Sequence, residues 1–297
     1  MMYFSSLKVY YRICRLESWT SWIFSFVLGS ILFSLPSPER FITVSLAFML
    51  ATASIFVINQ YFDREADKHN DAKKRLPLAS GSLSSRESIL FSALLVSSSL
   101  VLVLLTDVLL LPPFIFYLGL GMAYSAPFPN LKTVPIADFT VSAVGAGFLP
   151  FYIGLATSRL SAVNILPMIL ISMPLMAFHS GGHLVHALGD YSADMDFGLN
   201  TFPVKYGQKK AAFLTMFFFF LAFLSPFIYL LLGMIQPVHF AIAVVLIPLS
   251  MPILIRFIEL CKQPSEEHAM NLQKTVKKIG VFGLVIILAY ILAVRFL

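Results

Sequence analysis

The apolar residues of this chain are gathered into runs of about twenty, and this pattern limits the possible folds more than any other feature of the sequence. A helix of about twenty residues is about 30 Å long, which is the thickness of the hydrocarbon core of a bilayer. Only 12% of the 297 residues are charged, whereas a soluble protein of this length carries about 25%. The sequence therefore predicts an all-α, multi-spanning membrane protein.

Nine segments are predicted to cross the membrane, at about 17–36, 41–62, 88–106, 109–126, 136–156, 164–187, 210–233, 237–259 and 276–296. The third and fourth are separated by the short stretch TDVLLLPP, which begins at Thr106. The first run starts near Trp19 and lacks a small-residue cleavage pattern after it, so we interpret it as a span and not as a removed signal peptide. One bundle forms the whole core, so residues 1–297 are predicted to be a single domain.

Lysine and arginine are distributed unevenly between the predicted loops. With the N-terminus inside, eighteen of the 21 lie on the inside: Lys8, Arg12, Arg15, Arg64, Lys68, Lys73, Lys74, Arg75, Arg86, Lys132, Lys205, Lys209, Lys210, Arg256, Lys262, Lys274, Lys277 and Lys278. Arg40, Arg159 and Arg295 remain outside. The positive-inside rule therefore predicts a cytoplasmic N-terminus and, with nine spans, an external C-terminus. The two cysteines, Cys14 and Cys261, fall at predicted cytoplasmic ends, so no disulfide framework is expected.

Two acidic motifs repeat along the chain at an offset of 127 residues. NQYFDREADKHN aligns with HALGDYSADMDFG, so that Asp63 corresponds to Asp190 and Asp67 to Asp194. Each copy lies where a long apolar segment meets the predicted inside face, and a polar loop with a proline follows it. We interpret the chain as two weakly repeated halves and a last helix, at roughly 17–126, 136–259 and 276–296.

Residues four apart lie on one face of a helix, so the two carboxylates of each motif are predicted to point the same way. Asn59 lies one turn deeper than Asp63 on that face. Like charges at this spacing repel, which favours a cation between them. Mg²⁺ takes one or two carboxylates from a protein and its other ligands from water and phosphate. Two such pairs are therefore expected to hold two Mg²⁺ ions and a diphosphate.

Basic residues near the acidic motifs are candidates for binding the diphosphate: Arg15, Arg64, Lys73, Lys74, Arg75 and Lys132. Each of them has a second interpretation as a positive-inside anchor, and the net charge of +6 suits anionic headgroups as well as an anionic substrate. A diphosphate at the mouth of an apolar bundle implies a hydrocarbon tail inside it, and prenyl diphosphates have this shape. Cleavage of their C–O bond releases diphosphate, whose developing charge metal ions stabilise.

In these motifs the chain resembles the UbiA-type intramembrane prenyltransferases. The resemblance rests on Asn59, Asp63, Asp67, Asp190 and Asp194, on YSAPFPNLK (Tyr124 to Lys132) and on LASGSLS after the basic loop. It implies a nine-helix bundle around a central cavity with a lateral opening toward lipid. It also implies Mg²⁺-dependent transfer of a prenyl group from a polyprenyl diphosphate to a lipophilic acceptor.

The same resemblance implies roles for particular residues. Asn59 and the four aspartates would bind Mg²⁺ and diphosphate, and Tyr124 and Lys132 would belong to a loop that covers the site. Many family members have Asp directly after the motif Asn, where this chain has Gln60. Position 60 is predicted to face away from the carboxylate pair of Asp63 and its neighbour one turn on.

Three histidines, His179, His183 and His186, lie with Asp190 on one face of a helix. Their spacing allows a zinc site, packed and hydrogen-bonded histidines, or a polar wall of the substrate cavity. We expect His183 and His186 to contact substrate. Together with YSAP, His183 is similar to the carotenoid-prenylating (lycopene elongase) branch of the family, whereas the quinone-precursor and archaeal ether-lipid branches share most other features.

A transporter of an anionic lipid or metabolite is the alternative function, because internal repeats and polar residues within spans suit transporters. The acidic residues lie at one predicted face and not at the bilayer midplane, which favours the enzyme. The expected partners are a polyprenyl diphosphate, a lipophilic acceptor and membrane lipid, with no nucleic acid. The expected location is the cell membrane, with the mouth of the active site at the cytoplasmic face.

Overall fold

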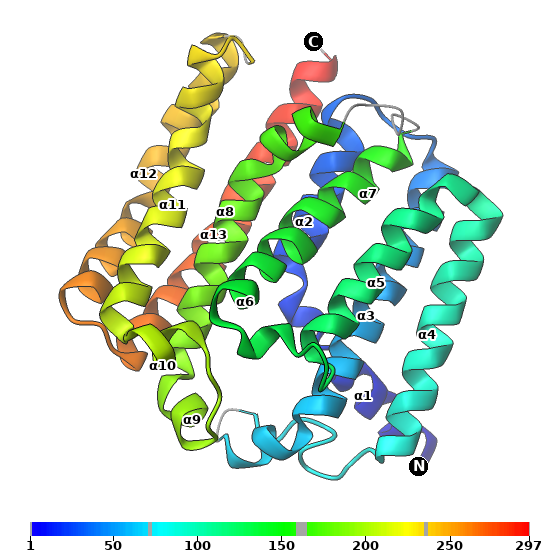
Figure 1. Cartoon of the computed structure of the whole chain (residues 1–297). Coiled ribbons are helices and arrows are strands. Elements are labelled where there is room, and N and C mark those ends of the chain that lie inside the picture. The colour runs from blue at the N-terminus through cyan, green and yellow to red at the C-terminus, as the bar shows by residue number, and fades with distance from the viewer. Residues whose placement is uncertain (1, 71–72, 159–164, 235–236, 297) are drawn as a thin grey trace. The chain divides into compact units, whose positions relative to one another are not determined.

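The computed structural model describes residues 2–70, 73–158, 165–234 and 237–296. Every regular element in these ranges is a helix, so the predicted all-α class is confirmed (Figure 1). Asp71, which the sequence places one turn beyond Asp67, lies outside the described residues, and so does Arg159.

The elements follow one another as α1 (Met2–Cys14), η1 (Leu16–Ser18), α2 (Thr20–Leu32), α3 (Pro38–His69), α4 (Ser85–Thr106), η2 (Val108–Leu110), α5 (Leu111–Ser125), η3 (Leu131–Thr133), α6 (Pro135–Ser142), the π-helical η4 (Ala143–Phe148), α7 (Leu149–Thr157), α8 (Ile165–Gly189), α9 (Tyr191–Asp196), α10 (Phe202–Tyr206), α11 (Gln208–Leu231), α12 (Pro237–Lys262) and α13 (Glu266–Phe296). Within the described ranges, eight helical stretches are long and apolar enough to cross a membrane. The first predicted span corresponds to α2, a shorter apolar helix of 13 residues. The predicted break between the third and fourth spans is present as η2.

Helix α3 is longer than the span predicted at 41–62, and this difference positions the first acidic motif. It begins at Pro38, after Ser37, whose hydroxyl accepts the N–H of Arg40. It continues to His69, so its 32 residues extend about 48 Å, well beyond the thickness of about 30 Å of a hydrocarbon core. The polar turns that follow Asn59 are therefore the part of α3 that projects from the apolar region.

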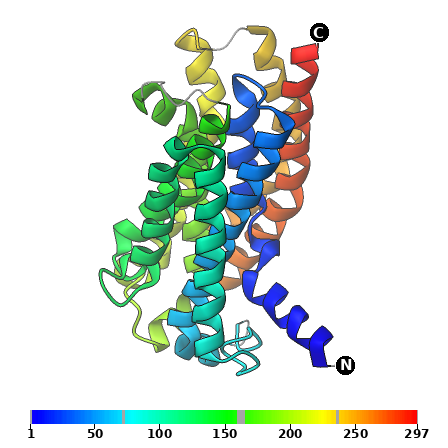
Figure 2. The same cartoon turned by 90° about the vertical axis from the view of Figure 1, so that its right-hand side faces the viewer.

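The chain divides into two compact units, of which the first contains residues 1–132 and 149–163. In this unit α4 packs along α3, as both views of the chain show (Figures 1 and 2). Small polar side chains join the two helices, since Ser99 Oγ donates to the Ala47 carbonyl at 2.7 Å. A buried hydrogen bond of 2.9 Å joins Thr52 of α3 to the Tyr117 hydroxyl of α5. These contacts fix the helices that carry the first acidic motif.

Helices α2 and α7 cross where each has a glycine. A Cβ added to Gly29 would lie 2.0 Å from the carbonyl oxygen of Phe151, and one added to Gly154 would lie 2.0 Å from that of Phe26. Both neighbouring atoms belong to the backbone, so they cannot yield unless a whole helix moves. The two glycines therefore set the separation of α2 and α7.

Gly29→Ala is expected to destabilise the protein, because its methyl group would be forced against a backbone carbonyl. Overpacking typically costs about 1–3 kcal/mol, and the rigid neighbour places this substitution at the upper end of that range. The measurement is the Tm in detergent. The control is Gly119→Ala on α5, where an added Cβ meets nothing within 4 Å. Equal Tm values for the two variants would contradict the close packing of α2 against α7.

Arg40 holds the end of unit 1 that lies opposite the acidic motif. Its Nε donates to the carbonyl of Thr157 at 2.7 Å, and its Nη2 lies 2.7 Å from Asp107 Oδ2 and 3.4 Å from the carbonyl of Ala156. The arginine therefore satisfies carbonyls at the C-terminus of α7, where a helix favours positive charge. This buried role accounts for one of the three bases that depart from the positive-inside pattern.

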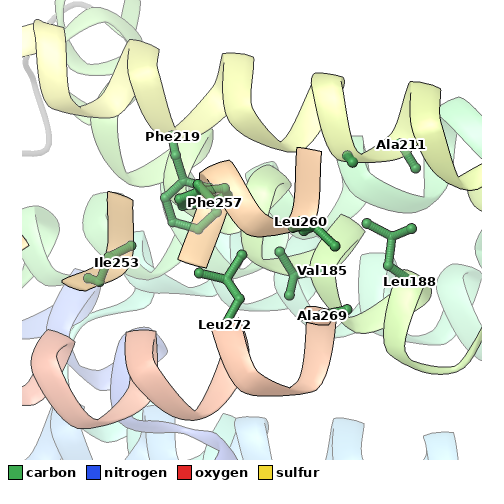
Figure 3. Packing of buried hydrophobic residues seen from close by; sticks show 10 residues of the cluster. Val185, Leu188, Ala211, Phe219, Ile253, Phe257, Leu260, Ala269 and Leu272 are labelled. Carbon is green, nitrogen blue, oxygen red and sulfur yellow. The ribbon is translucent and has the colours of Figure 1, made fainter. Parts of the chain in front are cut away.

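The second unit contains residues 133–148 and 164–297. Its core lies where α8, α11, α12 and α13 meet, and Figure 3 shows the cluster. The buried members include Leu188 of α8, Phe219 of α11, Leu260 of α12 and Leu272 of α13. Gly181 allows the approach of α11, because a Cβ there would lie 2.6 Å from the Phe219 ring. This core supports α8, which ends at the second acidic motif. The expectation of one domain with two repeated halves stays a prediction.

Candidate functional site

The first acidic motif is organised around Asp63 on the projecting part of α3. One carboxylate oxygen accepts a hydrogen bond of 2.9 Å from the Asn59 side-chain amide, and the other pairs with the ammonium group of Lys132. The Asn59 amide also donates to Ser125 Oγ at 3.3 Å. Asp63 and Lys132 are both largely shielded from solvent, with 21% and 18% of their side chains exposed. A carboxylate, an amide and an ammonium group therefore meet at one point.

Lys132 reaches Asp63 because the segment after α5 turns back toward α3. Its preceding loop contains Asn130, whose φ of 55° lies in the left-handed region that asparagine tolerates. Lys132 itself lies in the short helix η3. The family resemblance implied that Lys132 belongs to a loop that covers the site. In the structure Lys132 pairs directly with Asp63. Tyr124, one residue before Ser125, is half-buried at the end of α5.

Asp67 follows one turn further along the same continuous helix, so its carboxylate lies on the same face as that of Asp63. It is 8% exposed, although it sits near the polar end of α3. The helix ends just after it at Asn70, which has extended backbone and whose N–H bonds to the Asp67 carbonyl at 3.3 Å. The Asn70 carbonyl accepts the N–H groups of Lys73 and Lys74 at 2.9 and 2.8 Å. The basic loop thus starts as a tight turn beside the motif.

The three arginines among the site candidates lie in different surroundings. Arg64 lies about 100° around the helix from Asp63, where it donates to the Tyr61 carbonyl at 2.7 Å and covers the Tyr61 ring at 4.9 Å. Arg15 covers the Phe56 ring at 5.7 Å. Arg75 is exposed, and its carbonyl accepts a hydrogen bond of 2.6 Å from Arg12. Among the basic candidates, Lys132 makes the contact with Asp63, from the short helix η3 that follows α5.

Gln60 faces away from the carboxylates, as the helical spacing predicts. Its side-chain amide donates to the carbonyl of Ile13 at 2.5 Å, and the residue is 1% exposed. Its Oε1 is buried without a hydrogen-bond partner among the described residues. At this position, where many family members have Asp, the chain uses an amide to join α3 to the end of α1.

The second acidic motif differs from the first in its local structure. The sequence predicts one helix through Asp190 and Asp194, but α8 ends at Gly189 and the short helix α9 begins at Tyr191. Two backbone hydrogen bonds preserve the four-residue spacing, from Asp190 N–H to the His186 carbonyl at 3.0 Å and from Asp194 N–H to the Asp190 carbonyl at 2.8 Å. Asp194 Oδ2 also accepts the Thr201 hydroxyl at 3.1 Å.

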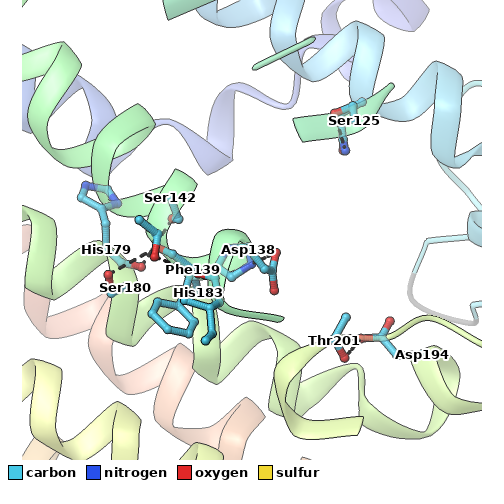
Figure 4. A network of polar contacts seen from close by, with 12 residues as sticks. Ser125, Asp138, Phe139, Ser142, His179, Ser180, His183, Asp194 and Thr201 are labelled. Carbon is cyan, nitrogen blue, oxygen red and sulfur yellow. Dashed lines mark hydrogen bonds and ion pairs between the residues drawn. The ribbon is translucent and has the colours of Figure 1, made fainter. Parts of the chain in front are cut away.

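Polar side chains continue along α8 below this motif, and Figure 4 shows them in close-up. His183 Nε2 lies 2.7 Å from Asp138 Oδ1 of α6. His179 is buried, and its carbonyl accepts the Ser142 hydroxyl at 3.4 Å. His186 is exposed. The interpretation as packed, hydrogen-bonded residues fits the first two histidines. No group of three or more His, Cys, Asp or Glu able to hold a metal ion is found in the described ranges, so zinc has no support there.

Asp138 is a polar site residue that the sequence interpretation missed. It lies in the first turn of α6, within the stretch PIADFTVSAV, and is 2% exposed. Ionisable residues inside predicted spans commonly mark functional sites, and this signal could have identified it. Its partner His183 is 45 residues further along the chain, which hides the pair from any local pattern.

The oxygen-rich donor set of the first motif fits a hard divalent cation. Asp63 already holds a positive charge, the Lys132 ammonium, on one of its carboxylate oxygens. Asp67 adds a second carboxylate one turn away, and the Asn59 side chain contacts the first. A protein site for Mg²⁺ needs only one or two carboxylates when phosphate and water supply the remaining ligands. The residues present therefore fit the metal that the motif predicts.

An apolar hollow of about 600 Å³ lies between α3, α4 and α5 in the same unit. Ile58, next to Asn59, and Met122 are among its lining residues. Two of its serines turn their hydroxyls to backbone carbonyls, Ser54 to Ala51 at 2.7 Å and Ser92 to Ser54 at 3.4 Å. The walls are therefore suited to hydrocarbon and not to a polar ligand.

Membrane-crossing helices, together with carboxylate, amide and ammonium groups that meet at the end of a long helix, define an integral membrane protein with a polar site at the edge of its apolar region. The chain belongs to the UbiA prenyltransferase family, whose family model matches residues 20–277, and it is accordingly a prenyltransferase. Family membership favours the enzyme over the transporter alternative.

Known relatives agree with this assignment. The chain is 26% identical over 223 residues to the digeranylgeranylglyceryl phosphate synthase of Methanocaldococcus jannaschii, covering 74% of this chain and 73% of the relative. It is 29% identical over 176 residues to the 4-hydroxybenzoate octaprenyltransferase of Pseudomonas fluorescens, covering 58% and 56%. It also matches the structure of a UbiA homolog from Archaeoglobus fulgidus bound to GPP and Mg²⁺, with a TM-score of 0.72, 21% identity and coverage of 94% and 99%. The last likeness shows that the fold is shared.

Proposed function

We propose that this protein transfers a prenyl group from a polyprenyl diphosphate to a lipophilic acceptor within the membrane, in a Mg²⁺-dependent reaction. The observation that carries the proposal is the contact of Asp63 with Asn59 and Lys132 at the end of α3. The oxygens of Asp63 and Asn59 suit a hard cation, and the ammonium group of Lys132 suits a phosphate. The three groups meet where the apolar part of α3 ends and its polar part begins. The UbiA homolog bound to GPP and Mg²⁺ supports this choice of donor and metal.

The proposed metal ligands are Asn59, Asp63, Asp67, Asp190 and Asp194. The bound metal supplies positive charge that stabilises the departing diphosphate. Like charges four residues apart repel, and a bound cation would relieve the repulsion within each pair. The carboxylates therefore serve to attract the metal and to fix its position at the mouth of the apolar region.

Lys132 has two successive partners in this proposal. In the structure its ammonium neutralises Asp63. With a divalent cation held by Asn59, Asp63 and Asp67, the Lys132 ammonium would be available to donate to a phosphate oxygen of the donor. Tyr124 belongs to the same covering segment. The other proposed diphosphate contacts are Arg15, Arg64, Lys73, Lys74 and Arg75. Within the basic loop of Lys73, Lys74 and Arg75, we expect Arg75 to matter most, since a guanidinium can hold two phosphate oxygens at once.

The acceptor is proposed to be a lipophilic molecule with a nucleophilic position: a quinone precursor, an archaeal ether-lipid precursor or a carotenoid. Relatives named digeranylgeranylglyceryl phosphate synthase and 4-hydroxybenzoate octaprenyltransferase support an ether-lipid precursor and a quinone precursor, and the likeness of His183 and YSAP to the lycopene elongase branch supports a carotenoid. The apolar hollow beside Asn59 offers room for a hydrocarbon chain. His183 and His186 are proposed to contact the acceptor.

The test is incubation of the purified protein with Mg²⁺ and geranylgeranyl diphosphate, with 4-hydroxybenzoate, geranylgeranylglyceryl phosphate or a carotenoid as acceptor. We expect a Mg²⁺-dependent product whose mass equals donor plus acceptor minus diphosphoric acid. Chelation by EDTA should abolish it, and added Mg²⁺ should restore it. A protein that is folded and forms no such product with any of the three acceptors would overturn the proposal.

The orientation of the chain is proposed to place both acidic motifs at the cytoplasmic face. Asn200→Cys, in an exposed loop after the second motif, should then resist an impermeant maleimide added to intact cells, whereas Glu39→Cys in the first turn of α3 should react. Burial raises the pKa of the native Cys14 thiol to about 11, so it stays protonated and slow to react at neutral pH. Cys261 is replaced by Ser in both variants. Labelling of position 200 with protection of position 39 would reverse the orientation.

A further inference from the structure

The pair formed by His183 and Asp138 has the arrangement of a base held by an orienting carboxylate. His183 Nε2 lies 2.7 Å from Asp138 Oδ1, and the Asp138 side chain is 3% exposed. The two residues come from α8 and α6, which lie against each other within unit 2 (Figure 4). A carboxylate this deeply buried is costly unless it is paired, and the imidazole supplies the partner.

The contact with Asp138 fixes which nitrogen of His183 carries the proton. Asp138 Oδ1 faces Nε2 of the ring at 2.7 Å. An ionised carboxylate only accepts hydrogen bonds, so the proton of a neutral His183 is on Nε2. The lone pair is then on Nδ1, which is the basic nitrogen of the ring. Asp138 therefore sets the tautomer and the orientation of His183.

His183 lies deeper along α8 than the second acidic motif, where the prenyl chain of a bound diphosphate would lie. It precedes Asp190 by seven residues on the same helix face, which places it about 10 Å deeper along α8. A prenyl diphosphate with its head at the second motif would have its first carbon atoms at this depth.

We propose that His183 accepts the proton that the acceptor loses during prenyl transfer, and that Asp138 positions it. The inference rests on the proposed function. In the reaction the C1–O bond of the donor breaks and both electrons leave with diphosphate. The nucleophilic atom of the acceptor gives an electron pair to C1, and its proton passes to His183 Nδ1 and later to water. A hydroxyl, an aromatic C–H and the cation formed from an alkene each release one proton, so all three acceptor classes need such a group.

The competing explanation is that the pair only joins α6 to α8. A structural pair would affect folding and substrate binding together, whereas a proton acceptor affects the chemical step. His183→Gln retains an N–H donor for Asp138 but removes the base, so the variant should keep the helix contact. Asp138→Asn retains His183 but no longer fixes its tautomer. His268→Gln is the matched control, since this histidine lies in the same unit and contacts Ser265 at the start of α13, at 2.7 Å.

The experiment compares kcat and the donor KM of these variants with those of the wild-type protein, using geranylgeranyl diphosphate, Mg²⁺ and the acceptor that gives product. Loss of a general base typically costs about 10²–10⁴-fold, so kcat of His183→Gln should fall by that factor while the donor KM changes by less than threefold. Asp138→Asn should show a smaller loss of kcat. The wild-type rate should fall at acidic pH, and this fall should disappear in His183→Gln.

A further variant separates the proton role from packing. In His183→Ala, added imidazole should restore part of kcat, and the restoration should rise with the concentration of neutral imidazole. Unchanged kcat in His183→Gln, or a loss of kcat with a parallel rise in donor KM and no rescue by imidazole, would overturn the role of His183. A wild-type protein that forms no product with any acceptor would instead overturn the proposed function, so the two failures are distinguishable.

Discussion

Asp63→Asn is expected to reduce the rate of prenyl transfer by about 100-fold or more, while the protein remains folded. The substitution removes the negative charge that draws a divalent cation to the end of α3, and an amide is a poor ligand for Mg²⁺ in comparison with a carboxylate. Folding should survive because the asparagine amide oxygen can still accept a hydrogen bond from Lys132, while the repulsion between positions 63 and 67 is removed. Asp190→Asn is expected to have an effect of the same size.

The measurement is kcat at saturating donor over a range of Mg²⁺ concentrations, with the Tm of each variant in detergent. The matched control is Glu65→Gln, which makes the same carboxylate-to-amide change two residues away on the same helix. Glu65 is exposed and holds Lys68 at 2.9 Å. Exposed ion pairs of this kind contribute about 0.2–1 kcal/mol, so this control should be close to wild type. Near-normal turnover of folded Asp63→Asn would remove Asp63 from the proposed metal site.

Lys132→Ala is expected to change two quantities in opposite directions. The Mg²⁺ concentration required for half-maximal rate should fall, because the ammonium that occupies Asp63 no longer competes with the metal. The donor KM should rise, because the variant lacks an ammonium group for the diphosphate. Hydrogen bonds to charged groups contribute about 1.5–3 kcal/mol, which corresponds to a rise of about 10- to 150-fold in the donor KM.

Two further variants sharpen this test. Lys132→Arg retains the positive charge, so it should keep the competition with Mg²⁺, although the shape of a guanidinium differs from that of an ammonium. Lys68→Ala removes a lysine from the same face of the membrane without touching Asp63, and both of its Glu65 contacts are exposed. A donor KM that rises equally in Lys132→Ala and Lys68→Ala would show a general effect of charge and contradict a specific contact of Lys132 with diphosphate.

Hydropathy alone identified the membrane-crossing helices, because a run of about twenty apolar residues has few alternatives in lipid. The predicted span ends at position 62, and α3 continues for seven residues beyond it, as the shared helix face predicted for Asp63 and Asp67 requires. Those residues are polar and form local contacts such as the pair of Glu65 and Lys68, which stabilise a helix without adding hydropathy. The second motif departed from the prediction, because the break after Gly189 has no hydropathy signal.

Contacts between distant residues were the part of the site that the sequence could not supply. Asp63 and Lys132 are 69 residues apart, and His183 and Asp138 are 45 residues apart. Helical spacing relates residues within one or two turns, so it predicted the face shared by Asp63 and Asp67 but not the partners from other helices. The start of α4 was also missed, since the predicted span begins at position 88, whereas the capping box of Ser84 and Glu87 starts the helix at Ser85.

The contacts of Arg40 also have a consequence for biosynthesis. A chain is made from its N-terminus, so Arg40 is synthesised 67 residues before Asp107 and 117 residues before Thr157. Its guanidinium is therefore unpaired at first, is neutralised when the turn after α4 arrives, and reaches the α7 carbonyls only after that helix is complete. The contacts at this end of unit 1 therefore form in the order of synthesis, and a chain truncated before α7 would leave Arg40 with one of its three partners, Asp107.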